Sequence, residues 1–395
     1  MNPSTCKHFG LCGGCAHLDQ EYGKELKKKE NFLQSLFKDF RHVNFRPILA
    51  SPDKEYYRFK LQVPFGRRNI GNKTITILGL FNRDSSFIVD QQECKIQDPG
   101  LSEILQAVKA WAKREDLPPY NEKSKKGILK YLVARKSFSS NEILVGIVTN
   151  QDHLPHAKDA SKRLHSAITD RIGKSGKFGK LVGIIQNINT KQSNMALGKE
   201  ENLLWGRPYI HEQIGAYKFR VGLSTFLQTN PSQTVSLYNL ILDEIQKGDS
   251  VIDAFSGIGT ISLWLSSVAK EVIGIEDNPN SYKAAIESLK VNRIKNVRYR
   301  RGRVHEILPS LLHKPFNVLV LDPPRVGLGE ELSDLLSESN FEKIVYVSCD
   351  PKTLRFDSNF ITKGYYLQSL QAVDMFPRTD HMEAVAVFTK KKTRS

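Results

Sequence analysis

The chain of 395 residues has no long apolar run and only five cysteines, and these two scarcities exclude several classes of protein. A membrane-spanning helix needs about 18 or more consecutive apolar residues, and no segment approaches that length. The first residues, MNPSTCKHFG, lack the apolar core of a secretory signal peptide. We therefore expect a cytoplasmic protein. In that reducing compartment, few cysteines argue against a disulfide framework and for metal binding or catalysis.

Acidic residues are also scarce relative to basic ones. The chain has 58 Lys and Arg against 42 Asp and Glu, which gives a formal net charge of +16. Such a surplus favours a polyanionic partner, most simply a nucleic acid, although a protein can be basic without binding one. The sequence contains no internal repeat, low-complexity tract or long linker. Its length predicts two or three domains.

Three of the cysteines, Cys6, Cys12 and Cys15, form a C-x5-C-x2-C pattern near the N-terminus. Two glycines between the last two would let the backbone wrap closely around a small object. With the distant Cys94, they would supply four thiolates to an iron–sulfur cluster or a zinc ion. Three close cysteines and one distant cysteine suit a cubane cluster, whereas only one C-x2-C pair is present for zinc. Zinc and incidental cysteines remain the alternatives.

The pattern of the chain changes at about Phe226. Before this point, residues 17–40 are expected to form a helix, and residues 45–220 a mixed, mostly β region with a helix near residues 101–113. The strands expected in that region are residues 57–65, 74–81, 86–90, 128–136, 142–149, 181–189 and 209–222. The predicted domains are residues 1–215 and residues 216–395.

The second domain is expected to be a doubly wound α/β sheet. Seven hydrophobic strands alternate there with helical segments, which is typical of a mainly parallel sheet. A helix is expected at residues 231–245, before the first of these strands. The last two strands lack a long helix between them, so we expect them to close the sheet as an antiparallel hairpin.

A candidate cofactor site follows the first of the seven strands. Asp253 near the end of that strand leads through FSGIGT into a helix, and the glycines allow a tight turn and the close approach of a ligand. Glu276 ends the second strand about 20 residues later, a spacing that suits binding of ribose hydroxyls. The third glycine of the dinucleotide fingerprint is missing, so with seven strands the pattern favours S-adenosylmethionine over NAD. The alternative is an ordinary strand–helix turn.

Three side chains with reactive groups fall at the ends of other strands. Cys349 follows the fifth strand, Asp322 the fourth, and Glu383 opens the seventh. Ligands of open α/β sheets bind at the carboxyl ends of the strands, so a thiol there is placed for chemistry, although a cysteine can also be a small buried hydrophobe. Asp322 precedes two prolines and Arg325, whereas enzymes that methylate exocyclic amines usually carry an aromatic residue after the prolines. Arg325 therefore argues against amine methylation.

A thiol, a carboxylate and a methyl donor together predict one mechanism. The C5 carbon of a pyrimidine is a poor nucleophile, but addition of a thiolate to C6 makes C5 enolate-like and able to attack a methyl group. A base must then remove the C5 proton so that the thiol can leave. Cys349 is the predicted nucleophile and Glu383 the predicted base. The target base must first leave its stack, which is easiest in a loop or single strand.

Taken together, these motifs resemble the RNA uracil-C5 methyltransferases of the TrmA/RumA/RumB group. The matching segments follow the order of the family over nearly the whole chain: C-x5-C-x2-C with Cys94, FLQTNP (226–231), DAFSGIGTISL (253–263), Glu276, LDPPRVGLG (321–329), VYVSCDPKTL (345–354) and DMFPRTDHMEAV (374–385). The resemblance implies a seven-stranded methyltransferase domain, with Cys349 as nucleophile and Glu383 as base. It implies methyl-donor contacts at Gln228, Phe255, Thr260, Glu276 and Asp322. It also implies a [4Fe-4S] cluster on Cys6, Cys12, Cys15 and Cys94.

Within the group, the chain looks most like the RumB (RlmC) branch, which implies a uridine of 23S ribosomal RNA as the target. All four cluster cysteines are present, Cys6 lies too near the start for a small RNA-binding TRAM domain, and residues 119–121 and 126–131 also look like that branch. Archaeal relatives with the cluster methylate tRNA, so the same chemistry on a T-loop uridine stays open. A non-catalytic RNA-binding assembly factor is the alternative from another class. We expect a monomer, with RNA contacts among Lys123, Lys125, Lys126, Lys130, Arg298, Arg300, Arg301 and Arg303.

Overall fold

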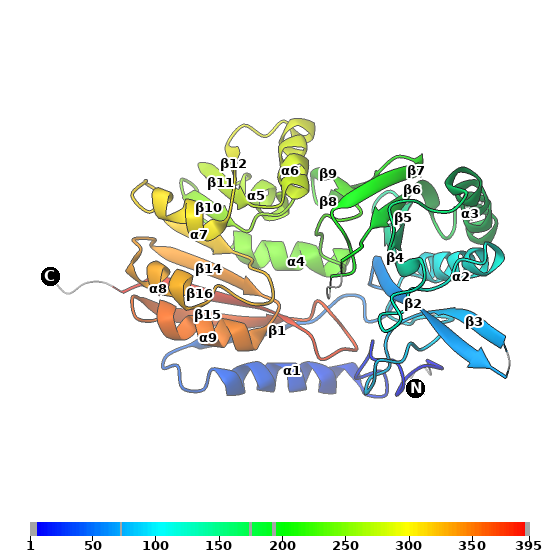
Figure 1. The fold of residues 1–395 in the computed structure, drawn as a ribbon. Coiled ribbons are helices and arrows are strands. Elements are labelled where there is room, and N and C mark those ends of the chain that lie inside the picture. Colours follow the sequence, from blue (N-terminus) through cyan, green and yellow to red (C-terminus); the bar gives the residue numbers. More distant parts are fainter. Residues whose placement is uncertain (1–5, 72, 174–175, 192–194, 392–395) are drawn as a thin grey trace. The chain divides into compact units, whose positions relative to one another are not determined.

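The computed structural model describes residues 6–71, 73–173, 176–191 and 195–391 (Figure 1). The chain divides into two compact units, each made of separate stretches of sequence. Unit 1 contains Lys54–Gln213, Arg220–Ser224 and the residues up to Asp19, and unit 2 contains Gln20–Asp53, Ile214–Phe219 and the residues from Thr225 onward. The predicted boundary at residues 215 and 216 falls in the hairpin of β8 (Tyr209–Ile214) and β9 (Tyr217–Gly222), which has residues in both units. Within the described residues, no helix has the length and apolar character needed to cross a membrane.

Unit 1 is built on a six-stranded mixed sheet with the strand order β3-β2-β4-β5-β6-β7. The strands are β2 (Lys60–Ile70), β3 (Lys73–Leu78), β4 (Leu129–Lys136), β5 (Glu142–Thr149), β6 (Lys180–Ile188) and β7 (Glu200–Gly206). Only β5 and β6 are parallel among these pairs, because α3 (Ala157–Ile172) forms the crossover between them. Together with α2 (Pro99–Arg114), α3 contributes to a core on one face of the sheet.

Most strands expected in unit 1 are confirmed, with four differences. The strand expected at residues 209–222 is the two-stranded hairpin of β8 and β9. The segment at residues 86–90 is not a strand, since Ile88 makes only an isolated bridge with Phe81. The helix α3 and the strand β7 were not predicted. In β7 most side chains are exposed, so its sequence shows little of the apolar alternation that identifies a strand.

Unit 2 contains an eight-stranded sheet with the order β1-β15-β16-β14-β13-β10-β11-β12. The strands are β1 (Asn44–Leu49), β10 (Ser250–Ala254), β11 (Glu271–Glu276), β12 (Val297–Arg301), β13 (Val318–Leu321), β14 (Lys343–Ser348), β15 (Tyr365–Val373) and β16 (Glu383–Lys390). All seven predicted strands are present, but the count of seven is wrong for this sheet. The additional strand β1 comes from before unit 1 in the sequence and pairs in parallel with β15.

The last strand runs opposite to the others, as the missing helix between the last two strands predicted. β16 lies between β14 and β15 and is antiparallel to both. Its first residue therefore lies at the edge where the parallel strands end, which brings Glu383 to the carboxyl edge of the sheet.

Helices cover one face of this sheet and form its main core. They are α1 (Tyr22–Leu36), α7 (Val304–Ile307), α8 (Glu330–Glu338) and α9 (Pro351–Ile361). The helix α1 begins at Tyr22 rather than near residue 17, contributes Leu33 to this core, and lies against β1 and α9 (Figure 1). Elsewhere in unit 2 are α4 (Pro231–Leu242), α5 (Thr260–Leu265) and α6 (Pro279–Asn292).

Candidate active site

Three predicted catalytic and donor-site residues meet at the carboxyl edge of the unit 2 sheet. Cys349 directly follows β14, where Pro351 starts α9 and prevents the strand from continuing. In the register of β14 and β16, Ser348 lies opposite Ala384, so the next position on each strand is Cys349 and Glu383. Asp322 directly follows β13, the other neighbour of β14. Residues far apart in the sequence are therefore placed side by side, as predicted from the strand ends.

Glu383 is almost fully buried, with 3% of its surface exposed. Its Oε2 atom accepts no hydrogen bond from any described residue. Burial, and next the negative charge of Asp322, raise the pKa of Glu383 well above its ordinary value, while the charge of Arg325 opposes the shift. A buried carboxylate oxygen without a partner is unusual in folded proteins and marks a group that is available to a ligand or a proton.

The Cys349 thiol has the same electrostatic surroundings. Burial is the largest effect, and with the charges of Glu383 and Asp322 it raises the pKa of Cys349 to about 11. Arg325 acts in the opposite direction and is the basic residue that sequence reasoning cited only against amine chemistry. Its Nη2 lies 3.2 Å from His381 Nδ1 and its Nε lies 3.9 Å from Asp350 Oδ2, so both contacts hold its charge near the site.

Burial also raises the pKa of Asp322 to about 7. Asp253, on the neighbouring strand β10, shows the same behaviour: burial raises its pKa to about 7, while a hydrogen bond from the Ser262 hydroxyl opposes this. Both carboxyl groups therefore keep their protons to a higher pH than exposed aspartates do. Perturbed pKa values of this kind are typical of functional sites.

The turn after β10 has the backbone that the glycine pattern predicted. Phe255 has a φ of +66°, and Gly257 and Gly259 also adopt left-handed conformations. A Cβ atom on Gly259 would lie 2.0 Å from the Tyr299 hydroxyl, so no larger residue fits there. This turn lies beside Glu276, whose carboxylate accepts hydrogen bonds from the amides of Gly257 at 2.8 Å and Asn278 at 2.6 Å.

The two remaining residues predicted to contact the methyl donor are Thr260, on α5, and Gln228, just before α4. Thr260 is the first residue of α5, and its hydroxyl accepts a hydrogen bond of 2.8 Å from Tyr238 on α4. Gln228 lies in the segment before α4, with 7% of its surface exposed. Asn230 caps α4 by accepting from the Gln233 amide and donates to the Met375 carbonyl at 3.2 Å, which fixes this segment to the loop that leads to Glu383.

Buried ion pairs from α1 hold that loop. The Lys29 ammonium donates to Asp374 at 2.7 Å and to Glu25 at 2.8 Å, and all three side chains are at most 3% exposed. Tyr22 donates to the second oxygen of Asp374 at 2.8 Å, and the Arg378 amide donates to Glu25 at 2.7 Å. No sequence pattern identified this network, because the two segments that it joins, α1 and the loop before β16, are more than 340 positions apart.

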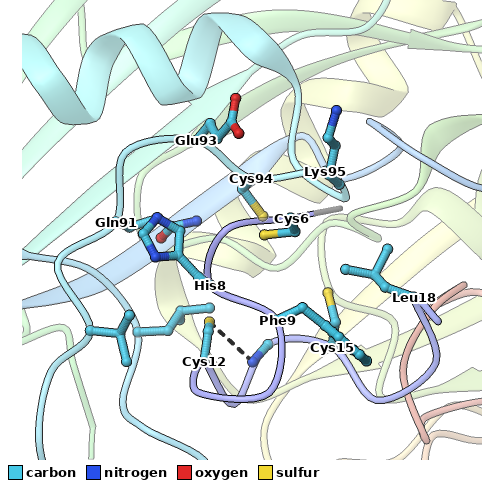
Figure 2. Close-up of a pocket in the computed structure, with 13 residues that line it drawn as sticks. Cys6, His8, Phe9, Cys12, Cys15, Leu18, Gln91, Glu93, Cys94 and Lys95 are labelled. Carbon is cyan, nitrogen blue, oxygen red and sulfur yellow. Dashed lines mark hydrogen bonds between the residues drawn. The ribbon is translucent and has the colours of Figure 1, made fainter. Parts of the chain in front are cut away.

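The four N-terminal cysteines line one cavity in unit 1 (Figure 2). Cys6, Cys12 and Cys15 come from one segment and Cys94 from another, and the wall between them includes Leu18, Phe9, Leu80 and Val89. Within the described residues, however, no group of three or more His, Cys, Asp or Glu side chains is arranged to hold a metal ion. The structure therefore brings the predicted ligands together without showing a metal centre.

The chemistry of this cavity fits a group that takes thiolates. Burial raises the pKa of Cys12, and it raises the pKa of Cys94 to about 11. Gly14 donates its amide to the Cys12 sulfur at 3.4 Å, and a Cβ at Gly14 would lie 2.8 Å from Leu80. Half-buried thiols with an N–H donor in a largely apolar wall suit a cluster that replaces their protons, because metal ligation requires the thiolate form.

The expected RNA contacts are placed differently from one another. Lys123, Lys125 and Lys126 are exposed in a turn closed by Asn121. Lys130 is only 5% exposed, donates to the carbonyls of Asn189 and Lys191, and lies over the Tyr120 ring. The prediction that Lys130 is a surface contact is therefore wrong, because its charge already serves the fold of unit 1.

The fold and the edge site define the class of the protein: an α/β methyltransferase with a second, β-rich unit. A family model described as tRNA (Uracil-5-)-methyltransferase matches residues 21–392, and the chain belongs to this family.

Known proteins support this assignment over the whole chain. An uncharacterized RNA methyltransferase of Leptospira interrogans is 43% identical over 386 residues, which are 98% of each chain. Another, from Clostridium acetobutylicum, is 35% identical and is covered over 83% of its length by 98% of this chain. Among solved structures, the Pyrococcus abyssi tRNA (uracil-54, C5)-methyltransferase in complex with S-adenosyl-L-homocysteine is similar with a TM-score of 0.76 and 25% identity. That similarity covers 96% of this chain and 85% of the archaeal one.

The buried network of α1 leads to a prediction about stability. Replacing Lys29 by Met would leave the buried Asp374 without its cation and Glu25 with Arg378 alone, and breaking a buried ion pair in this way typically lowers the free energy of unfolding by about 3–5 kcal/mol. Urea unfolding of the purified protein measures this loss. Lys24→Met, on the same helix but with 72% of its side chain exposed, is the matched control and should change stability by less than ~0.5 kcal/mol. Equal effects of the two substitutions would contradict the assigned role of the network.

Proposed function

We propose that the protein methylates C5 of a specific uridine in 23S ribosomal RNA with S-adenosylmethionine as the methyl donor. The observation that carries this proposal is the meeting of a thiol and a partnerless buried carboxylate, Cys349 and Glu383, beside Asp322 at the carboxyl edge of the sheet. Neither an amine methyltransferase nor a non-catalytic RNA-binding factor needs this combination.

In the proposed reaction, the Cys349 sulfur forms a bond to C6 of the uracil ring, and C5 becomes nucleophilic. The bound donor supplies the methyl group that C5 takes. Glu383 then accepts the C5 proton, and the electron pair of that bond restores the C5–C6 double bond as the sulfur–C6 bond breaks. Its raised pKa makes Glu383 a stronger base than an exposed carboxylate. Arg325 favours the thiolate, since its positive charge lowers the pKa of Cys349.

The donor would lie along the edge from β10 to β13. Glu276 is suited to ribose hydroxyls, although its oxygens already accept two backbone hydrogen bonds, so a bound ribose shares or replaces them. The left-handed turn at Phe255 lets the backbone approach the ligand closely. Asp322, beside Cys349, would hold the reacting end of the donor, and Thr260 and Gln228 would complete the proposed contacts.

Two kinds of RNA fit the proposal. The resemblance of residues 119–121 and 126–131 to the RumB branch supports 23S rRNA. The similarity to an archaeal enzyme named for uracil 54 of tRNA supports the T-loop alternative. Both targets need a uridine that can leave its stack, so the chemistry at Cys349 is the same for either RNA.

We propose further that Cys6, Cys12, Cys15 and Cys94 hold a [4Fe-4S] cluster. Their shared cavity and the amide that Gly14 donates to sulfur support it. The proposed methylation needs no electron transfer, so a structural or RNA-docking role is favoured. We also propose that the enzyme acts as a monomer in the cytoplasm.

The substrate proposal predicts where 5-methyluridine is lost in a deletion strain. One uridine of 23S rRNA should lack its methyl group, and the purified enzyme should transfer labelled methyl groups to a transcript of that region. The measurement is mass spectrometry of nuclease fragments of both rRNA and tRNA. Loss from the T-loop of tRNA alone would replace the rRNA assignment by the tRNA one. Unchanged methylation of both would contradict the enzyme proposal.

The mechanism predicts opposite behaviour of two active-site variants. Cys349→Ala should abolish methyl transfer and also the denaturant-stable adduct with RNA that contains 5-fluorouridine, because no sulfur is available. Glu383→Gln should slow product release and accumulate covalent enzyme–RNA on ordinary substrate, since the C5 proton is not removed. Denaturing gels with labelled RNA measure both. Normal turnover of Glu383→Gln would show that Glu383 is not the base.

The cluster proposal predicts a coloured protein. Purified without oxygen, it should be brown with broad absorbance near ~400 nm and should contain iron and sulfide. Cys94→Ser should lose this absorbance, whereas Cys349→Ser, which leaves the four ligands intact, should retain it. Colourless protein with stoichiometric zinc would overturn the assignment in favour of a zinc site.

A further inference from the structure

Two basic side chains lie directly opposite each other in the sheet of unit 1. Lys60 on β2 pairs with Arg135 on β4 in the antiparallel register. Their neighbours Leu61 and Ala134, also opposite each other, belong to the core shared with α2 and α3. Because side chains alternate along a strand, Lys60 and Arg135 lie on the other face of the sheet, which we call the second face.

A third cation belongs to this pair. Arg58 precedes Lys60 by two positions, and its Nε donates to the Lys60 carbonyl at 3.1 Å, which holds the guanidinium beside the lysine. Like charges placed opposite each other in a sheet are destabilising, so such a cluster calls for a compensating negative charge.

That compensation is missing at Lys60. Its ammonium group makes no hydrogen bond or ion pair with any described residue, and the charges that act on it are those of Arg135 and Arg58. Arg135 is 4% exposed, donates to the Leu223 carbonyl at 3.1 Å and is influenced by Glu201. Burial, and then Arg135 and Arg58, lower the pKa of Lys60 to about 7, and burial lowers that of Arg135 to about 10.

Two other lysines of unit 1, one buried and one half-buried, show how the chain satisfies such a charge. Lys136 has both oxygens of Asp98 at 2.9 Å, and Lys109 has Asp90 at 2.9 Å. Buried charges are normally paired in this way. A lysine kept between two arginines without a carboxylate is suited to an anion that comes from outside the protein.

We propose that Lys60 and Arg58 bind one phosphate of the RNA backbone on the second face of the unit 1 sheet, and that the buried Arg135 adds positive charge beside Lys60. The ligand chemistry is a phosphodiester, which the Arg58 guanidinium would meet with its planar fork of N–H donors and the Lys60 ammonium as a point charge. This inference rests on the proposed function, since it assigns the RNA a contact away from the reacting base. It gives unit 1 a defined part in holding the substrate.

The test compares Lys60→Gln with wild-type protein in binding to an RNA substrate over a series of salt concentrations. Loss of one phosphate contact should weaken binding on the order of tenfold. It should reduce the slope of log K against log salt by roughly 0.7–0.9. The maximal rate at saturating RNA should stay unchanged, and Lys60→Arg should retain the wild-type slope. Lys113→Gln, an exposed lysine on α2, is the control and should leave affinity and slope unchanged.

Thermal unfolding separates this role from a structural one. Removing a cation from between two others relieves repulsion, so Lys60→Gln should be at least as stable as wild type. A lower melting temperature with an unchanged salt slope would overturn the proposal, because Lys60 would then serve the fold. If Lys60→Gln loses stabilisation by inorganic phosphate but keeps the full RNA slope, the site binds a free anion and the proposal is also overturned.

The same experiments distinguish this inference from the function on which it rests. If wild-type protein methylates RNA and Lys60→Gln binds it with an unchanged slope, only the phosphate site is wrong. If wild-type protein methylates no RNA, the proposed function fails. The phosphate site would then be supported only if Lys60→Gln still reduced the salt dependence of RNA binding.

Discussion

The reversed direction of one strand is the constraint on which the candidate site depends. β16 runs antiparallel between β14 and β15, so that it starts where its neighbours end. If this strand of eight residues ran the other way, Glu383 would lie roughly 23 Å away, at the opposite edge of the sheet. The reversal also explains why Glu383 has a buried oxygen without a partner: the strand end carries it into the interior, next to Cys349.

At that edge, burial and neighbouring negative charges raise the pKa values of the acidic groups. Cys349, Asp322, Asp253 and Glu383 all have raised pKa values, and Arg325 is the positive charge that opposes the shift at Cys349 and Glu383. A site of this kind is poorly charged when free and becomes reactive when a ligand brings compensating charge or excludes water. The loop that leads to Glu383 is fixed by Lys29, which forms buried ion pairs with Asp374 in that loop and with Glu25.

Each unit contains a buried lysine that is paired with carboxylates, but Lys60 is not paired in this way, and this difference has functional meaning. Lys29 in unit 2 and Lys136 in unit 1 have buried carboxylate partners, and both serve the fold. Lys60 has no such partner, although the chain has acidic residues enough to supply one. In a basic protein of an RNA methyltransferase family, an unmatched cation of this kind is better explained by the substrate than by stability.

The sequence by itself determined the features whose signals are local. The edge site was predicted from three local signals: strand ends marked by Cys349, Asp322 and Glu276, the glycine turn after β10, and the missing helix before β16. The family model supports the class of the protein. Tertiary structure decided what depends on distant partners. The strand β1 pairs with β15, and Lys29 forms its ion pair with Asp374. Lys130 is buried because it donates hydrogen bonds to the carbonyls of Asn189 and Lys191. The sequence likewise did not predict that Lys60 lies opposite Arg135, because this contact arises only when β2 pairs with β4. Long-range pairing and burial set these environments, and neither is encoded in the pattern of neighbouring residues.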